Sequence, residues 1–157
     1  MTIIAIDVGG TNARFGIAET DKEPLTGIKN LICADFPRLE DAIDAYIETS
    51  TDTPSLEIDA ISIAVAAPVI GDNIVVTNNH WQFSKTALLE YLPINSLLVI
   101  NDFTAQALAQ TDPEAAGNQL VLKGASRVDA PLLVIGAGTG LGVATLIQAN
   151  NGYQVIE

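Results

Sequence analysis

The sequence predicts an α/β fold in which three antiparallel strands are followed by parallel strands and helices in one mixed sheet. Three observations support this prediction. Residues 2–8, 14–19 and 27–34 are apolar segments joined by short polar connections, as is typical of antiparallel neighbours. After Pro37 the apolar residues recur at helical spacing. The run 60–66 is continuously apolar and rich in β-branched residues, which indicates a parallel strand covered on both faces.

The remaining elements follow from the same patterns. A short strand is expected at 74–77, and a helix is expected after Ser84, whose hydroxyl suits an N-cap. A buried strand at 97–100 leads directly into a further helix. The helix after Pro37 has an apolar face and an acidic face, so it is expected to cover the sheet. Its apolar face comprises Leu39, Ile43, Tyr46 and Ile47.

Composition and charge exclude several classes of protein. The chain has 157 residues, of which 48% are apolar, so it can bury a real core. Its net charge of −12 opposes binding to nucleic acid and to anionic membranes. The longest apolar run is too short to cross a bilayer and no secretory leader is recognisable, so a cytoplasmic protein is expected. Cys33, the single cysteine, is expected to be a small buried hydrophobe.

The first candidate site is the glycine-rich turn after the first strand. Paired glycines lack a Cβ and allow positive φ, so backbone amides can approach an anion such as phosphate. A carboxylate beside a phosphate needs a cation between them, so Asp7 indicates Mg²⁺, held directly or through water. An ordinary β-hairpin turn is the alternative for this stretch alone. The site comprises Asp7, Val8, Gly9, Gly10, Thr11 and Asn12.

The second candidate site is the polar segment 78–81, which lies between two apolar elements. It follows the carboxyl ends of the predicted strands, where open α/β sheets place their ligands. The side chains of Asn78 and His80 suit a polyol. The alternative is a surface loop in which Trp81 anchors the start of the following helix.

The third candidate site is the junction at Asn101 and Asp102, where a buried strand ends and a helix begins. Asp102 at this position can be a simple N-cap, a role worth about 1 kcal/mol. The same position also faces the carboxyl ends of the strands, where a carboxylate can accept a proton from a substrate hydroxyl. Asn101 would then orient that hydroxyl.

A boundary is predicted at residues 112–118, which are polar and contain Pro113 and Gly117. We therefore expect a small lobe over 1–112 and the incomplete start of a second lobe over 113–157, with strands at 119–122, 132–135 and 143–148. The glycine-rich stretch 136–142 is neither a dinucleotide fingerprint nor a Walker loop, because the required spacings are absent. It joins two strands, as the first glycine-rich turn does.

This combination of motifs resembles the actin-like ATPase and sugar kinase superfamily, which has a ribonuclease H-like fold, and within it the bacterial glucokinase family. The resemblance implies transfer of the ATP γ-phosphoryl group to the 6-hydroxyl of glucose with Mg²⁺. By match, the turn at residues 7–12 together with Gly138 and Thr139 would bind the nucleotide, Asn101 and Asp102 would hold the sugar, and Asp102 would be the base. The motifs are Asp7 to Arg14, Thr77 to Trp81, Ile100 to Ala105 and Gly136 to Gly142.

The sequence differs from the family in length, and two alternative functions remain open. Proteins of this family are about twice as long, so the sequence is expected to be an amino-terminal part that is inactive by itself and associates with itself; the family also implies a homo-oligomer, a dimer. One alternative is a sugar-responsive regulator or assembly module that binds without chemistry. Another is a kinase for a different hexose or for an acid hydroxyl.

Overall fold

The computed structural model describes residues 1–20, 23–50, 57–112, 124, 127, 130–137, 140–150 and 152–157. The chain forms two compact units, Met1–Asp102 and Phe103–Glu157, which are described separately. Among the described residues, no helix has both the length and the apolar character needed to span a membrane.

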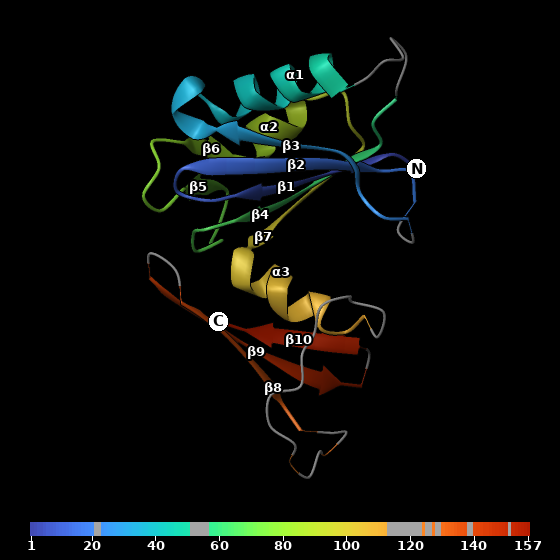
Figure 1. The fold of residues 1–157 in the computed structure, drawn as a ribbon, viewed down its shortest axis with the longest axis vertical. Coiled ribbons are helices and arrows are strands. Elements are labelled where there is room, and N and C mark those ends of the chain that lie inside the picture. The colour runs from blue at the N-terminus through green and yellow to red at the C-terminus, as the bar shows by residue number, and fades with distance from the viewer. Residues whose placement is uncertain are drawn as a thin grey trace. The chain divides into compact units, whose positions relative to one another are not determined.

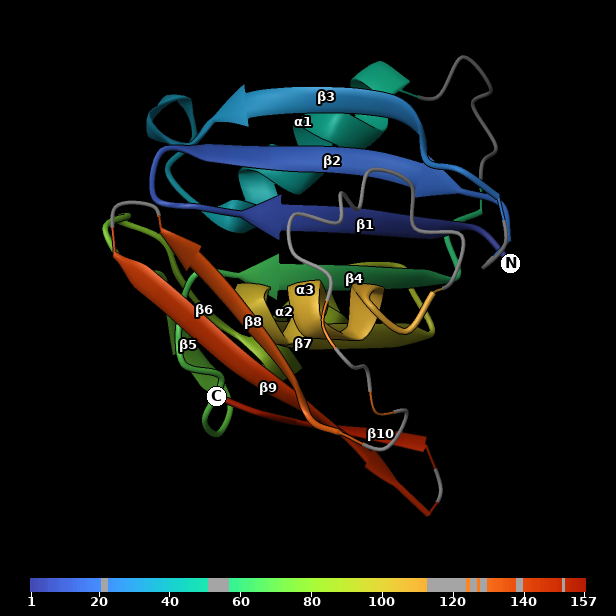
Figure 2. The ribbon, with the colours of Figure 1, turned by 60° about the horizontal axis from the view of Figure 1, so that its bottom comes forward.

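The first unit is built on a five-stranded mixed sheet with the order β3-β2-β1-β4-β7 (Figure 2). Strands β1, β2 and β3 pair antiparallel, as their short connections predict. Strand β4 lies parallel to β1, and β7 lies parallel to β4. The strands are β1 (Ile3–Val8), β2 (Asn12–Ala18), β3 (Thr26–Ile32), β4 (Ala60–Val65) and β7 (Ser96–Asn101).

One face of this sheet is covered by the helices α1 (Leu39–Ser50) and α2 (Lys85–Tyr91). Figure 1 shows α1 above the edge formed by β3 and β2. The predicted apolar helix face packs into the core through Leu39, Ile43 and Tyr46, and Ile47 is partly buried against it. The ring of Tyr46 stacks on Phe15 of β2 with 4.9 Å between centroids. Each alternate residue of β1 points into this core, because strand side chains alternate between faces.

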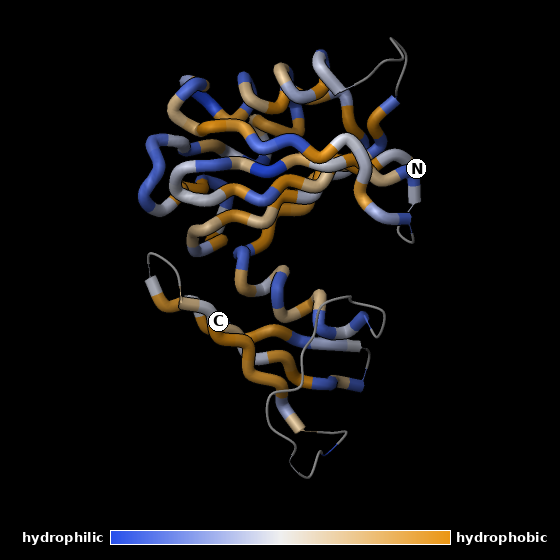
Figure 3. Tube along the Cα trace, in the orientation of Figure 1, coloured by the Kyte–Doolittle hydropathy of each residue, from blue (hydrophilic) through white to orange (hydrophobic). Residues whose placement is uncertain are grey.

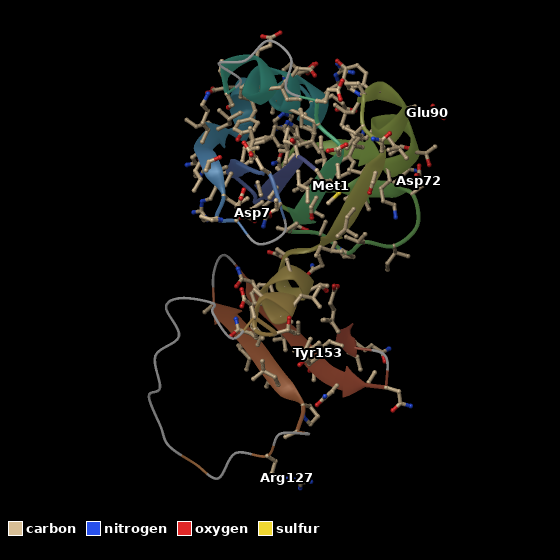
Figure 4. The ribbon with its side chains drawn as sticks, turned by 90° about the vertical axis from the view of Figure 1, so that its right-hand side faces the viewer. Met1, Asp7, Asp72, Glu90, Arg127 and Tyr153 are labelled. Carbon is tan, nitrogen blue, oxygen red and sulfur yellow. The ribbon has the colours of Figure 1, made fainter. Side chains whose placement is uncertain are left out.

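The strands β5 (Asn73–Val75) and β6 (Gln82–Ser84) pair antiparallel in a small two-stranded sheet, and residues 76–81 connect them. Ser84 accepts a hydrogen bond from the Ala87 amide, so its predicted role as N-cap of α2 is confirmed. Asp72 adds to this cap by accepting from the Ser84 hydroxyl and from the Thr86 amide and hydroxyl. These bonds lower the pKa of the Asp72 carboxyl, the Ser84 hydroxyl having the largest effect. Figure 4 shows Asp72 beside α2, on the opposite side of the first unit from Asp7.

The second unit contains α3 (Asp102–Ala109), which begins with the last residue of the first unit, and the antiparallel sheet β10-β9-β8. Its core is small and consists of Ala107, Ala144 and Leu146, with Phe103, Val134 and Val155 packed against them. In Figure 3 the strands β8 and β9 are largely coloured as hydrophobic. Leu141 is 71% exposed and Ile135 58% exposed, so much of this apolar surface is uncovered in residues 103–157. The strands are β8 (Leu132–Ala137), β9 (Leu141–Ala149) and β10 (Gly152–Ile156).

Several details differ from the sequence prediction. Strand β3 ends at Ile32, because residues 33–35 form a 3₁₀ turn, η1 (Cys33–Asp35). Strands β6 and β10 were not predicted. The two compact units divide after Asp102, and Phe103 and Ala107 pack with β8 and β9. The lobe boundary at 112–118 stays a prediction, because residues 113–118 lie outside the described residues. The strand predicted at 119–122 lies outside the described residues.

Candidate functional site

The parallel strands bring the candidate residues of the first unit to one edge of the sheet. Val8 is in register with Val65, and Val65 is in register with Asn101. The turn after β1, the segment after β4 and the residue Asp102 after β7 therefore emerge at the same edge. This is the edge where ligands of α/β sheets bind.

The glycine-rich turn between β1 and β2 is shorter than predicted, because β2 begins at Asn12 and not at residue 14. The Gly9 amide donates to the Asn12 carbonyl at 2.9 Å, so it is used within the turn. Neither Gly9 nor Gly10 is among the positive-φ glycines, so this turn does not use the positive φ that glycine allows. A Cβ on Gly10 would instead lie 3.2 Å from the Asn78 carbonyl oxygen and 3.3 Å from the Asn78 Cβ. Gly10 thus permits a close approach between this turn and the segment 77–78. The backbone amides of Gly10 and Thr11 are the candidate hydrogen-bond donors to a phosphate.

Asn79 bridges the two segments, and sequence reasoning missed it. Its Nδ2 donates to the Gly9 carbonyl at 3.1 Å, and its Oδ1 accepts from the Trp81 amide at 3.0 Å. The preceding residue, Asn78, has a φ of 57°, a conformation that asparagine tolerates better than most residues. The Asn-Asn pair in the sequence was the available signal, since asparagine side chains commonly bond to nearby backbone.

His80 and Trp81 share one backbone acceptor. The Phe36 carbonyl lies 2.9 Å from His80 Nε2 and 3.0 Å from Trp81 Nε1. Because a carbonyl only accepts, His80 Nε2 must carry the proton, and Nδ1 is the acceptor of the neutral ring. Trp81 is buried in the main core and its Nε1 donates to the Phe36 carbonyl, so it anchors the segment 78–81.

These groups surround a pocket of about 440 Å³. The pocket brings Gly10 and Thr11, predicted to bind the nucleotide, together with Asn78 and His80, predicted to bind the sugar. Cys33 is 2% exposed, and burial raises the pKa of its thiol, as expected for a small buried hydrophobe. The lining comprises Gly10, Thr11, Cys33, Ala34, Asn78, Asn79 and His80.

Asp7 lies on the sheet face opposite the helix-covered core and is exposed. Its cross-strand neighbour is Arg14, whose Nη1 lies 3.5 Å from the carboxylate. Within the described ranges, no group of three or more acidic, histidine or cysteine side chains could hold a metal. A single carboxylate still fits Mg²⁺, which proteins commonly bind through one or two carboxylates together with substrate phosphates and water.

Asn101 and Asp102 do not line this pocket, although they lie at the same edge of the sheet. Asn101 Nδ2 donates to the Ala67 carbonyl at 3.1 Å, which ties the end of β7 to the segment after β4. Asp102 is half-buried and is the first residue of α3. The structure therefore gives Asn101 a structural bond that the sequence did not indicate.

The second glycine-rich turn is only partly described. Ala137 pairs with Leu141, and Gly136 pairs with Gly142, so the predicted strand-turn-strand arrangement is confirmed. Gly138 and Thr139, predicted to reach the phosphates, lie outside the described residues.

Curated relatives are similar over nearly the whole chain. The glucokinase of Helicobacter pylori (strain P12) is 43% identical over 148 residues, which are 93% of this chain and 43% of that protein. A glucokinase of Neisseria meningitidis serogroup C (strain FAM18) is 38% identical over 151 residues, covering 96% of this chain and 44% of that protein. The chain thus spans less than half the length of the curated relatives that it matches.

Solved structures and a family model agree with these relatives. A glucokinase from an Antarctic psychrotroph matches with a TM-score of 0.85 and 29% identity, over 99% of this chain and 49% of that one. A ROK family glucokinase from Streptomyces griseus, solved with glucose and AMPPNP, shares the fold with a TM-score of 0.66 and 20% identity, over 98% of this chain and 46% of that one. The family model Glucokinase matches residues 4–157. The chain therefore belongs to the glucokinase family.

Proposed function

We propose that the whole protein is an ATP:glucose 6-phosphotransferase with the actin-like ATPase fold, and that Asp102 is its general base. The observation that carries this proposal is the shared edge of the parallel strands β1, β4 and β7. The first glycine-rich turn follows β1 and Asp102 follows β7, with β4 between these two strands. Membership of the glucokinase family supports the choice of substrates. A cytoplasmic location is part of the same proposal.

The sugar would be held by polar side chains at this edge. Asn78 and His80 line the pocket, and Asn101 and Asp102 follow β7. His80 Nδ1 can accept a hydrogen bond from a sugar hydroxyl, since Nε2 is used on the Phe36 carbonyl. An exposed rim of amide and imidazole groups suits a polyol.

The nucleotide phosphates would contact the first turn, through the amides of Gly10 and Thr11, and the second turn, through Gly138 and Thr139. Asn12 would help to hold this turn, because its carbonyl accepts from the Gly9 amide. Asp7 would hold Mg²⁺, directly or through water. When bound, Mg²⁺ neutralises charge on the phosphates.

Asp102 would accept the proton of the 6-hydroxyl while the hydroxyl oxygen attacks the γ-phosphorus. The bond between that phosphorus and the β–γ bridging oxygen would break, and ADP would leave. A half-buried carboxylate at a strand end has the fixed position that proton transfer requires. Positioning supplies most of the rate of such reactions, and a general base typically adds about 10²- to 10⁴-fold.

The test is Asp102→Asn in the full-length protein. We expect kcat to fall by about 10²- to 10⁴-fold while glucose affinity changes much less, because asparagine keeps the shape but cannot take the proton. Glu90→Gln, which neutralises an exposed carboxylate on α2, is the control and should leave kcat unchanged. If Asp102→Asn lowers the melting temperature and leaves turnover intact, Asp102 is only a helix cap and the proposal fails.

A further inference from the structure

Phe103 follows Asp102 directly, and its ring packs where the facing residues must be glycines. It lies in the first turn of α3, and its ring faces the β8–β9 hairpin. Gly136 and Gly142 are direct cross-strand partners in this hairpin. The ring therefore meets a pair of residues that have no side chains.

The space between ring and hairpin excludes any larger residue. A Cβ on Gly136 would lie 2.7 Å from Phe103 Cζ and 3.0 Å from Cε1, closer than real Cβ atoms come. A Cβ on Gly142 would overlap three atoms of the same ring, Cε2, Cζ and Cδ2. A phenyl ring is rigid and cannot yield at one end as a flexible side chain does. We name this pair of glycines the Phe103 notch.

Backbone conformation does not explain these glycines. The positive-φ glycines of the described residues are Gly27, Gly71 and Gly152, so Gly136 and Gly142 have a backbone that any residue adopts. Gly140, in the same turn, would place a Cβ where no heavy atom lies within 4 Å. The need for glycine at 136 and 142 is therefore steric and specific to the ring.

Other contacts hold the same turn of α3. Phe103 packs against the small core of Ala107, Ala144 and Leu146. The Thr104 hydroxyl donates to the carboxylate of Glu157. The ring and this bond together restrain rotation of the helix start.

We propose that Phe103 is a positioning residue: by seating its ring in the Phe103 notch it fixes the first turn of α3 and so orients the Asp102 carboxylate. The inference rests on the proposed role of Asp102 as base. It assigns Gly136 and Gly142 to the seating of this ring instead of to phosphate binding. A misplacement of a catalytic group by about 1 Å can cost about 10²-fold in rate, so a displaced ring should be seen in kcat.

The experiment compares variants of the full-length protein by kcat, by KM for glucose and ATP, and by melting temperature. Gly142→Ala forces the ring out and should lower kcat by about 10- to 100-fold with smaller changes in both KM values. Phe103→Ala removes the ring and should lower kcat similarly. The double variant Gly142→Ala/Phe103→Ala should melt at a higher temperature than Gly142→Ala alone, because the added methyl group no longer clashes with a ring. The changes in melting temperature of the two single variants should therefore not add up in the double variant.

Two controls separate positioning from stability. Leu146→Ala loosens the same core without touching the notch, so it should lower the melting temperature and keep kcat at assay temperatures where the protein is folded. Gly124→Ala places a Cβ where no heavy atom lies within 4 Å and should change nothing. Phe103→Leu provides a milder variant if the alanine variants do not fold.

The outcomes are distinct. Wild-type kcat in Gly142→Ala, or a loss of kcat that Leu146→Ala reproduces at equal melting temperature, overturns the positioning role. If the effects of Gly142→Ala and Phe103→Ala on melting temperature are additive, the claim that the Phe103 ring is seated in the Phe103 notch is wrong. An active Asp102→Asn overturns the proposed base, and the melting cycle still reports on the notch.

Discussion

The two glycine-rich hairpins look alike in sequence but use their glycines against different partners. In the β1–β2 hairpin, Gly10 comes close to the backbone of Asn78. In the β8–β9 hairpin, Gly136 and Gly142 receive the ring of Phe103. Neither hairpin has a described glycine at positive φ. A glycine-rich turn after a strand is thus evidence of a close approach, and the partner must be read from the fold.

The difference also limits the phosphate hypothesis. In the first hairpin the Gly9 amide is bound to Asn12, so only the next amides remain as candidate donors. In the second hairpin Gly136 and Gly142 lie against the Phe103 ring, so we propose that the phosphate role there belongs to residues 138 and 139. The two hairpins also differ in the hydrophobic core that they pack against, which is large for the first hairpin and small for the second.

The largest effect is expected for the polypeptide of residues 1–157 by itself. We predict no measurable glucokinase activity, because orientation by two closed lobes can supply about 7 to 11 kcal/mol of the barrier, more than a base contributes. The exposed apolar face of β8 and β9 should also make this polypeptide associate with itself. A coupled assay and light scattering check both points. Ordinary turnover would contradict the first point, and a strictly monomeric species would contradict the second.

Next in size is Gly10→Val in the full-length protein. If Gly10 served phosphate alone, this variant would bind ATP more weakly and glucose nearly unchanged. Because a Cβ here would meet Asn78, we expect KM to rise about tenfold or more for both substrates. Gly124→Val, in open space, is the control. A rise confined to ATP would show that Gly10 serves phosphate alone and not the segment 77–78.

A smaller effect is expected from Asn79→Ala, which removes the bridge between the two segments of the first site. Two hydrogen bonds are lost, each worth about 0.5 to 1.5 kcal/mol net. Chemical denaturation of the full-length protein should show a loss of about 1 to 3 kcal/mol in the free energy of unfolding. Asn73→Ala, at an exposed position of β5, should cost much less. Equal losses in the two variants would mean that the bridge does not stabilise the site.

The smallest effect concerns Asp72, which holds the far end of the β5–β6 hairpin. Its carboxyl pKa is lowered in the folded state, chiefly by the Ser84 hydroxyl, so its contribution is present above the ordinary Asp pKa of about 3.9. That contribution is lost as the pH falls through the lower folded pKa. Asp72→Asn should therefore melt below wild type near neutral pH, and the gap should close in acid. A gap that is constant with pH would exclude this linkage.

Local patterns made most of the first unit predictable. The strands β1 and β4 and the helix α1 follow from the spacing of apolar residues, and Ser84 is a cap that its neighbours reveal. Long-range contacts were not predictable. Nothing near Gly10 in the chain indicates Asn78, and nothing near Gly142 indicates Phe103, because these pairs meet only after the sheet has formed. Asn79 was missed for the same reason, since its bridge joins two distant loops.

The most direct test of the central claim is the product of the full-length protein with ATP, Mg²⁺ and a panel of hexoses, with isothermal titration of each sugar alongside. We predict that glucose is bound and converted to glucose 6-phosphate, with one ADP formed for each sugar phosphorylated. Binding of glucose without any phosphoryl transfer would contradict the account and would indicate a sugar-responsive module. Preferential turnover of another hexose would contradict the assignment of glucose.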